Sequence, residues 1–238
     1  TLVELVRSME ANPDTGLIQT VPLPGPQETR FGRFVEFAAG LYGPMLAAGQ
    51  SFWQGDAANY WGHNAIVRVE PFRTHCRLPV LGGRPPLGGE ILSHDFVEAA
   101  LLRRAGWKCY LRSDLGGSWE DVPSNLVDFA RRDRRWSQGS LQHLRLLAMR
   151  GLHPLSRVHF LLGAMGYVSS LLWLLLLLAS TAYGAGVSGL SDPRLAGVSA
   201  LGRWVMGPVA PSLLALTGLL LFLPKVLGLG LALRDHGP

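Results

Sequence analysis

The sequence predicts an α/β domain followed by transmembrane α-helices. Helical and strand patterns alternate through the first half of the chain, which favours a sheet covered by helices. In the second half, no Asp, Glu, Lys or Arg occurs from Val158 to Ser191, and the run Leu171 to Leu178 lies within this stretch. About 20 apolar residues in a row are enough to cross a bilayer, so a membrane-spanning helix is predicted there.

Composition and cysteine usage narrow the class of protein. Hydrophobic residues make up 48% of the 238 residues and 29 residues are Gly, which indicates a partly membrane-embedded chain. The chain begins with Thr1 and ends just after an apolar run, so we expect a fragment of a longer protein. Cys76 and Cys109 form neither a Cys-x-x-Cys pair nor a zinc spacing, and we interpret them as reduced thiols.

The first elements follow from apolar spacing. Residues at helical spacing predict a helix over 1–13, and the apolar run 17–21 predicts a short buried strand. An aromatic stripe predicts a helix over 31–49 whose aromatic side chains pack in the core. A strand is predicted over 65–69, and residues 70–90 are predicted to be loop.

Directly before the strand at 65–69, Gly62, His63 and Asn64 place polar groups and a permissive backbone at its leading edge. The aromatic face of Trp61 suits stacking on sugar C–H groups, and amides bond sugar hydroxyls. These residues favour a sugar-binding site. A β-turn with a satisfied histidine explains them equally well, and the residues alone leave both interpretations open.

The run Gly82–Gly89 is rich in glycine but is not a phosphate loop, because it lacks a Gly-Lys-Ser/Thr ending. We interpret it as a flexible connection with a gating role.

The stretch from Gly89 to Trp107 predicts a loop, a helix and a stop. Ser93 is placed to cap the helix, Asp95 falls in its first turn, and Gly106 is placed to end it. A carboxylate at the positive end of the helix dipole is favoured in its ionised form, as a general base requires. Taken alone, an Asp in a first turn is more often a capping residue.

Residues 107–111 predict a strand and 125–150 a long helical stretch, which carries Arg131, Arg132, Arg134 and Arg135. Four guanidinium groups in five positions can bind a diphosphate or lie on anionic lipid headgroups. A solvated helix face is the plain alternative. Nucleic acid is not an expected partner, because the basic run leads directly into apolar spans and no nucleic-acid motif is present.

Two membrane spans are predicted, near 160–183 and around 209–232, the second made irregular by prolines and Lys225. Seven Arg between 131 and 157 precede the first span, so the part before it is predicted to be cytosolic and the connection external. We therefore divide the chain into 1–130, an α/β portion; 131–157, interfacial helices; and 158–238, two transmembrane helices with an external connection.

Three phrases occur in order: Tyr60-Trp61-Gly62-His63-Asn64-Ala65, Ser93-His94-Asp95, and Arg132-Asp133-Arg134-Arg135-Trp136, and membrane spans follow. This order resembles the membrane-integrated, processive branch of family 2 glycosyltransferases, which includes the cellulose, chitin and hyaluronan synthases. The amino-acid sequences of these motifs are most similar to those of the bacterial enzymes that make the backbone of osmoregulated periplasmic glucans. The resemblance implies a glycosyltransferase-A-type α/β domain, of which this chain holds only the C-terminal part.

The resemblance also implies roles for single residues. Asp95 would be the catalytic base that deprotonates the acceptor sugar, with His94 beside it in the site. Arg135 would meet the nucleotide diphosphate and Trp136 would stack on the acceptor sugar, in a motif whose first position is Arg132 here and Gln in the wider family. Three further residues would line the acceptor site: Gly62, His63 and Asn64.

The family binds its metal nucleotide through an Asp-x-Asp motif, and this sequence contains none. We expect that motif, with its Mg²⁺ or Mn²⁺, upstream of Thr1. The implied reaction is inverting transfer from UDP-glucose to a growing β-glucan at the bacterial inner membrane, with the lipid bilayer and periplasmic glucan-processing proteins as partners. The fragment alone is expected to be inactive. The alternatives are a synthase of another polysaccharide, such as cellulose or hyaluronan, and a non-catalytic membrane scaffold or transporter subunit.

Overall fold

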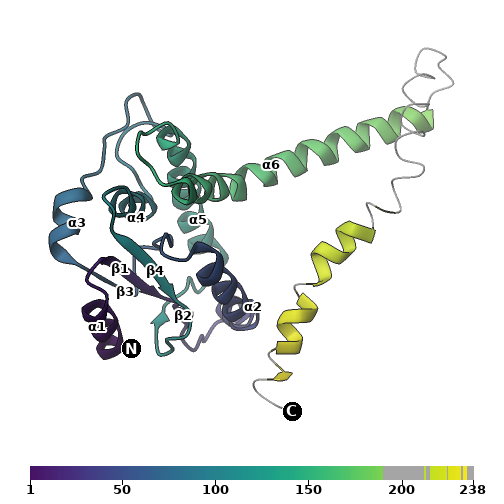
Figure 1. The fold of residues 1–238 in the computed structure, drawn as a ribbon. Coiled ribbons are helices and arrows are strands. Elements are labelled where there is room, and N and C mark those ends of the chain that lie inside the picture. Colours follow the sequence, from purple (N-terminus) through teal and green to yellow (C-terminus); the bar gives the residue numbers. More distant parts are fainter. Residues whose placement is uncertain (190–211, 213–214, 224, 232, 235–238) are drawn as a thin grey trace. The chain divides into compact units, whose positions relative to one another are not determined.

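The computed structural model describes residues 1–189, 212, 215–223, 225–231 and 233–234 (Figure 1). The chain divides into two units, residues 1–167 and 168–238. The first unit contains the sheet, the helices packed on it and the start of a long apolar helix. It also contains every predicted site residue.

A three-stranded sheet forms the centre of the first unit. Its strands are β1 (Thr15–Thr20), β3 (Ala65–Val67) and β4 (Lys108–Arg112), in the order β3-β1-β4. β1 is antiparallel to β3 and parallel to β4. The three predicted strands are therefore confirmed, with β3 ending two residues earlier than expected. A second, two-stranded sheet pairs β2 (Leu23–Pro24) in parallel with β5 (Trp119–Glu120).

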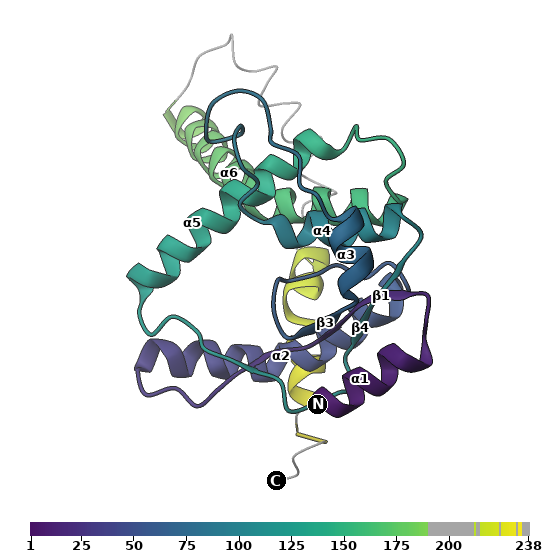
Figure 2. The same cartoon turned by 90° about the vertical axis from the view of Figure 1, so that its left-hand side faces the viewer.

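Both faces of β1 are covered, and all six of its residues are buried. Leu17 packs with Leu102 and Cys109 on one face, whereas Ile18 packs with residues of α1 (Leu2–Ala11) on the other. α3 and α4 lie on the opposite side of the sheet from α1 (Figure 2). Such two-sided covering is the layered α/β arrangement expected from the alternating sequence pattern. Cys109 is a free, buried thiol, as predicted.

α2 (Arg30–Gln54) begins one residue before the predicted helix and ends five residues after it. Thr29 caps its start by accepting a hydrogen bond from the Gly32 N–H. The prediction that its aromatic stripe packs in the core was wrong. Phe34 and Phe37 are 70% and 66% exposed. The helix meets the sheet near its other end, where the Ser51 hydroxyl donates to the Leu111 carbonyl of β4.

The prediction of loop throughout 70–90 was also wrong, because α3 occupies Val69–His75. Pro71 discourages a helix when its sequence is read alone. In the structure Pro71 lies in the first turn, where backbone N–H groups have no partner within the helix and a missing N–H costs little.

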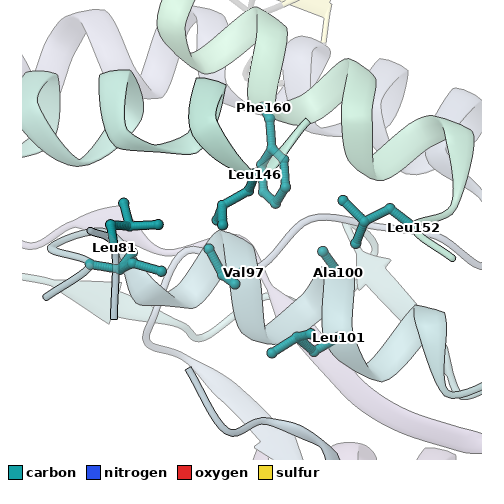
Figure 3. Packing of buried hydrophobic residues seen from close by; sticks show 8 residues of the cluster. Leu81, Val97, Ala100, Leu101, Leu146, Leu152 and Phe160 are labelled. Carbon is teal, nitrogen blue, oxygen red and sulfur yellow. The ribbon is translucent and has the colours of Figure 1, made fainter. Parts of the chain in front are cut away.

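α4 (His94–Arg104) is the most buried helix of the described chain segments that flank the sheet. One face packs on β1 and β4, and the other packs against η1 (Leu144–Leu146) and the start of α6 (Pro154–Gly189) (Figure 3). Gly106 ends it as predicted, with φ +92°. The Gly106 N–H bonds to the Arg103 carbonyl, and the Trp107 N–H bonds to the Leu102 carbonyl.

α5 (Leu126–His143) and η1 account for most of the helical stretch predicted at 125–150. The Asn125 side chain caps α5 by accepting from the Asp128 N–H. At its start α5 lies beside α2, because the rings of Phe31 and Phe129 pack edge to face with centroids 5.7 Å apart.

One described helix, Pro154–Leu178 within α6, is long and apolar enough to cross a membrane, and it coincides with most of the first predicted span. Over the second predicted span, 209–232, the described residues form a shorter apolar helix, Ala215–Leu231, and the second span is not confirmed. Residues 190–211, which hold most of the predicted external connection, lie outside the described residues.

Candidate active site

Asp95 lies in the first turn of α4, as predicted, and Ser93 occupies the N-cap position. The prediction that the Ser93 side chain caps the helix was wrong, since it makes no capping hydrogen bond. It faces α5 instead. A Cβ added at Gly139 would lie 2.7 Å from both the Cβ and the backbone nitrogen of Ser93. α5 therefore approaches the start of α4 at a distance that only glycine permits.

Burial raises the pKa of the Asp95 carboxyl above its usual value. Nearby His94, the backbone N–H groups of Phe96 and Asp95, and His63 oppose this shift. The helix N-terminus thus favours the ionised form, as the sequence predicts, but burial outweighs it. A half-buried carboxylate with a raised pKa binds a proton more readily than one in water, which suits a general base.

Gly62 lies directly against the Asp95 carboxyl. Its φ is +88°, and an added Cβ would stand 3.2 Å from Asp95 Oδ2. The backbone before β3 and the start of α4 are therefore neighbours, although 33 positions separate them in the chain. The structure brings these two predicted site residues together.

His63 and Asn64 form a hydrogen-bonded turn. The Nδ1 atom of His63 lies 2.9 Å from Asn64 Oδ1, and its Nε2 lies 3.4 Å from Glu120 Oε2. The Asn64 amide donates to the Ser118 hydroxyl at 2.6 Å and to the Trp119 carbonyl at 3.2 Å. Both ring nitrogens of His63 thus have a partner, as in the β-turn alternative considered for this segment. The amide group of Asn64 stabilises the turn through its two hydrogen bonds. Sequence reasoning missed Glu120, for which no local pattern signals proximity to His63.

The same turn is anchored to β1. Gln19 is fully buried, and its Oε1 accepts the Trp61 N–H at 2.6 Å. The Asn64 carbonyl accepts both the backbone N–H and the hydroxyl of Thr20 at 2.9 Å. Since β1 is the central strand, the backbone around Gly62 has a rigid support.

His94 is tied to the helix it begins. Its Nδ1 lies 2.9 Å from Glu98 Oε1, one turn further along α4, where Glu98 is only 8% exposed. Burial raises the pKa of Glu98, which the neighbouring His94 opposes. Burial also raises the pKa of the Tyr60 phenol, with further contributions from Glu98 and Asp95. Two carboxylates, an imidazole and a phenol thus share the region around the start of α4.

On α5, Arg132 stacks on Trp136. The Arg132 Cζ lies 4.5 Å from the Trp136 ring centroid and 5.7 Å from that of Phe129. The Nε atom of Arg132 is buried and has no hydrogen-bond partner among the described residues. Trp136 remains 46% exposed and Arg135 is exposed. The residue that replaces Gln in the predicted motif therefore contacts the tryptophan of that motif.

One stripe of α5 connects this motif to α4. Trp136, Gly139 and His143 follow at spacings of three and four, which places them on one helix face. Gly139 touches Ser93, and His143 bonds to the Ser93 carbonyl. Trp136 lies one turn before Gly139, about 4.5 Å along the axis. The Arg–Trp motif and Asp95 are therefore carried by two helices that meet at Ser93.

The segment Gly82–Gly89, predicted to be a flexible connection with a gating role, is tied by several hydrogen bonds, and its gating role stays a prediction. Leu81 and Gly89 exchange two backbone hydrogen bonds, of 3.0 and 2.8 Å, that close the loop. α5 holds the loop from outside, because Gln138 Nε2 donates to the Pro86 carbonyl at 3.1 Å. Arg145 of η1 donates to the Gly82 and Leu87 carbonyls.

No group of three or more His, Cys, Asp or Glu side chains that could hold a metal ion occurs among the described residues. The expected Asp-x-Asp motif upstream of Thr1 stays a prediction.

The region thus combines a half-buried aspartate at the start of α4, the Gly62 turn against its carboxyl and, across the contact of Ser93 with Gly139, the helix that carries Arg132 and Trp136. The chain belongs to glycosyl transferase family group 2, whose family model matches residues 1–187. No solved structure matches the chain significantly.

The similar curated proteins bear the name glucans biosynthesis glucosyltransferase H. The Rhodopseudomonas palustris protein is 56% identical over 178 residues, which cover 75% of this chain and 25% of that protein. The Cupriavidus pinatubonensis protein is 55% identical over 181 residues, covering 76% and 21%. The Klebsiella pneumoniae protein is 47% identical over 236 residues, covering 96% and 27%. The chain spans about a quarter of the length of these relatives.

Proposed function

We propose that this chain forms the acceptor side of an inverting, processive glucosyltransferase that uses UDP-glucose to extend a β-glucan, the backbone of osmoregulated periplasmic glucans. Family membership and the names of the relatives support this proposal. The observation that carries it is the placement of Asp95. Its half-buried carboxyl has a raised pKa and touches Gly62, and Ser93, two residues before it, touches Gly139 of the helix that bears the Arg–Trp motif.

In the proposed reaction, Asp95 takes the proton of the acceptor hydroxyl while that oxygen attacks C1 of the donor glucose. A new C1–O bond forms, and the bond from C1 to the phosphate oxygen breaks. UDP leaves with the electron pair, and attack from the opposite face inverts the configuration at C1. Asp95 lies in the first turn of α4, where the helix dipole favours the ionised carboxylate that must accept the proton.

Two residues of α5 would hold the reactants. The exposed part of the Trp136 ring offers a stacking surface for an acceptor sugar. The Arg132 guanidinium lies over the same ring and supports it. Arg135, exposed one position earlier, is available to neutralise the diphosphate charge that develops as UDP leaves. His63 and His94 place positive charge near the Asp95 carboxyl when protonated. Asn64 would act indirectly, through the turn it holds.

Mg²⁺ or Mn²⁺ would supply further charge neutralisation of the diphosphate in such a reaction. The described side chains form no cluster suited to it, so no step is assigned to a metal in this chain.

The proposed location is the bacterial inner membrane, with the α/β unit on the cytosolic side and the product passing to the periplasm. The apolar helix Pro154–Leu178 fits a membrane span by length and composition. The arginine-rich stretch that precedes it agrees with a cytosolic start under the positive-inside rule.

The test is Asp95→Asn in the complete membrane-embedded protein. The amide keeps the shape of the side chain but cannot take the proton. We expect glucan synthesis from radiolabelled UDP-glucose to fall by at least about a thousandfold, while UDP binding stays within about twofold of the wild type. Normal turnover by this variant would exclude Asp95 as the base. Linkage analysis of the hydrolysed wild-type product separates a periplasmic-glucan synthase from a cellulose or hyaluronan synthase.

A further inference from the structure

Two fully buried polar residues follow one another at the end of α5. Gln142 and His143 are each 0% exposed, although glutamine and histidine usually lie at least partly in water. Neither faces solvent, and neither is required by the proposed chemistry. Because burying a polar side chain is costly unless it is hydrogen-bonded, their partners indicate what they do.

Gln142 makes three hydrogen bonds, all to the backbone that leads into α4. Its Oε1 accepts the Leu92 N–H at 3.0 Å. Its Nε2 donates to the carbonyls of Glu90, at 3.0 Å, and Gly88, at 3.3 Å. One side chain therefore spans the segment immediately before the N-cap of the helix.

His143 holds the N-cap residue itself. A carbonyl oxygen can only accept, so the Nε2–H of His143 donates to the Ser93 carbonyl, at 2.8 Å. The ring is enclosed between Phe96 and Phe160, with centroids 5.3 and 4.9 Å away. Its Nδ1 is buried without a partner among the described residues, and burial lowers the pKa of the imidazole. The ring is therefore held neutral, with its one proton on Nε2.

We propose that His143 and Gln142 are positioning residues that fix the start of α4, and with it the Asp95 carboxyl, relative to the Arg–Trp motif on the same helix α5. This inference rests on the proposed role of Asp95 as the base. Ser93 lies two residues before Asp95 and in contact with Gly139. α5 carries Trp136 near one end of its contact stripe and His143 at the other. The same helix therefore positions both Trp136 and, through His143, the start of α4 that bears Asp95.

The mechanism predicts a specific loss. Without the Nε2–H bond, the Ser93 carbonyl loses one donor and the first turn of α4 is free to shift. A displacement of about 1 Å of a catalytic group can slow a reaction about a hundredfold. The loss should appear in kcat, because the donor nucleotide does not contact His143 in this scheme.

The experiment compares His143→Phe with His143→Gln in the complete membrane-embedded protein. Phe keeps the aromatic packing between Phe96 and Phe160 but has no N–H, whereas Gln loses the ring but keeps a donor near the Nε2 position. We expect His143→Phe to lower kcat about tenfold to a hundredfold with KM for UDP-glucose within about twofold of the wild type. We expect His143→Gln to recover kcat to within about threefold of the wild type.

His159→Phe is the matched control. His159 is also buried and also bonds a backbone carbonyl through Nε2, that of Ala57 at 3.1 Å, with its ring beside Trp53. Among the described residues, no hydrogen bond or ring contact joins His159 to Ser93 or to α5. Its loss should lower thermal stability about as much as His143→Phe while kcat stays within about twofold of the wild type.

The outcomes are separable. If His143→Phe keeps a normal kcat while His143→Gln is slow, the ring packing matters and the positioning bond does not, which overturns the inference. Normal kcat in both His143 variants overturns it as well. Should His143→Phe fail to accumulate in membranes, Gln142→Met decides by the same kcat criterion, since it removes three bonds to residues 88–92. Normal turnover by Asp95→Asn instead overturns the proposed function, whatever the His143 variants do.

Discussion

Replacing Gly139 by alanine tests the contact on which the geometry of the candidate site depends. The added Cβ would lie 2.7 Å from Ser93 Cβ and 2.7 Å from its backbone nitrogen, and closer still to its hydroxyl oxygen. Ordinary contacts of a Cβ begin near 3.4 Å, so α5 and the start of α4 must separate by about 0.7 Å or more. One of these atoms is the backbone nitrogen of Ser93, so the clash cannot be relieved by rotating a side chain.

The magnitude follows from two known effects. Overpacking of this kind costs about 1–3 kcal/mol of stability. Separation of the two helices also moves Asp95 away from Trp136, and a shift approaching 1 Å can slow catalysis by about a hundredfold. We therefore expect Gly139→Ala to lower kcat about tenfold to a hundredfold and to lower the unfolding temperature by several degrees.

The assay measures glucan synthesis and thermal unfolding of the complete protein in membrane vesicles. Gly40→Ala is the control, because it adds the same methyl group inside α2 with nothing within 4 Å, and it should be neutral or stabilise by about 0.5–1 kcal/mol. Ser93→Gly combined with Gly139→Ala removes the hydroxyl and Cβ clashes but not the clash with the backbone nitrogen. Its kcat should recover only in part. A Gly139→Ala protein with wild-type kcat would refute the argument that this contact sets the site.

Three further predictions concern charge. Because burial raises the pKa of Asp95 above its usual 3.8, kcat should fall with decreasing pH through a value above 3.8. The raised pKa also means that ionised Asp95 opposes folding, a contribution absent at low pH and acquired as pH rises through the folded-state pKa. Asp95→Asn should therefore have a higher unfolding temperature than the wild type at pH 7, and an unchanged or lower temperature would contradict this. Arg132→Gln removes a cation–π contact worth about 0.5–1 kcal/mol, so acceptor-dependent turnover should fall about twofold to fivefold at saturating UDP-glucose, with Arg132→Lys intermediate. A rise in KM for UDP-glucose without loss of kcat would instead place Arg132 at the donor.

Sequence patterns located most elements because those elements are encoded locally. The period of apolar residues distinguishes helix from strand, and it identified β1, β4 and α5 near their observed positions. Gly106 ended α4 as predicted, since a positive φ at that position is available to glycine at little cost. α3 was missed because a proline in the first turn of a helix looks the same, in sequence, as a proline that prevents one.

The functional contacts were less predictable, because they join residues far apart in the chain. Gly139 carried the one usable signal, since a glycine inside a long helix costs about 1 kcal/mol and usually has a packing reason. Gln142 and His143 carried none, because polar residues in a helix are ordinarily at its surface. The exposure of the aromatic residues of α2 likewise depends on where that helix meets the sheet.

The sequence by itself determined the class of protein, because the three phrases, their order and the apolar run after them are local features of the chain. It also located Asp95 at the start of a helix. Only the tertiary structure decided what surrounds that aspartate: Gly62 from the turn before β3, Ser93 held by His143, and α5 in close approach at Gly139. Those neighbours are set by how helices and sheet pack around a shared core, and packing distance is not written in the spacing of residues along the chain.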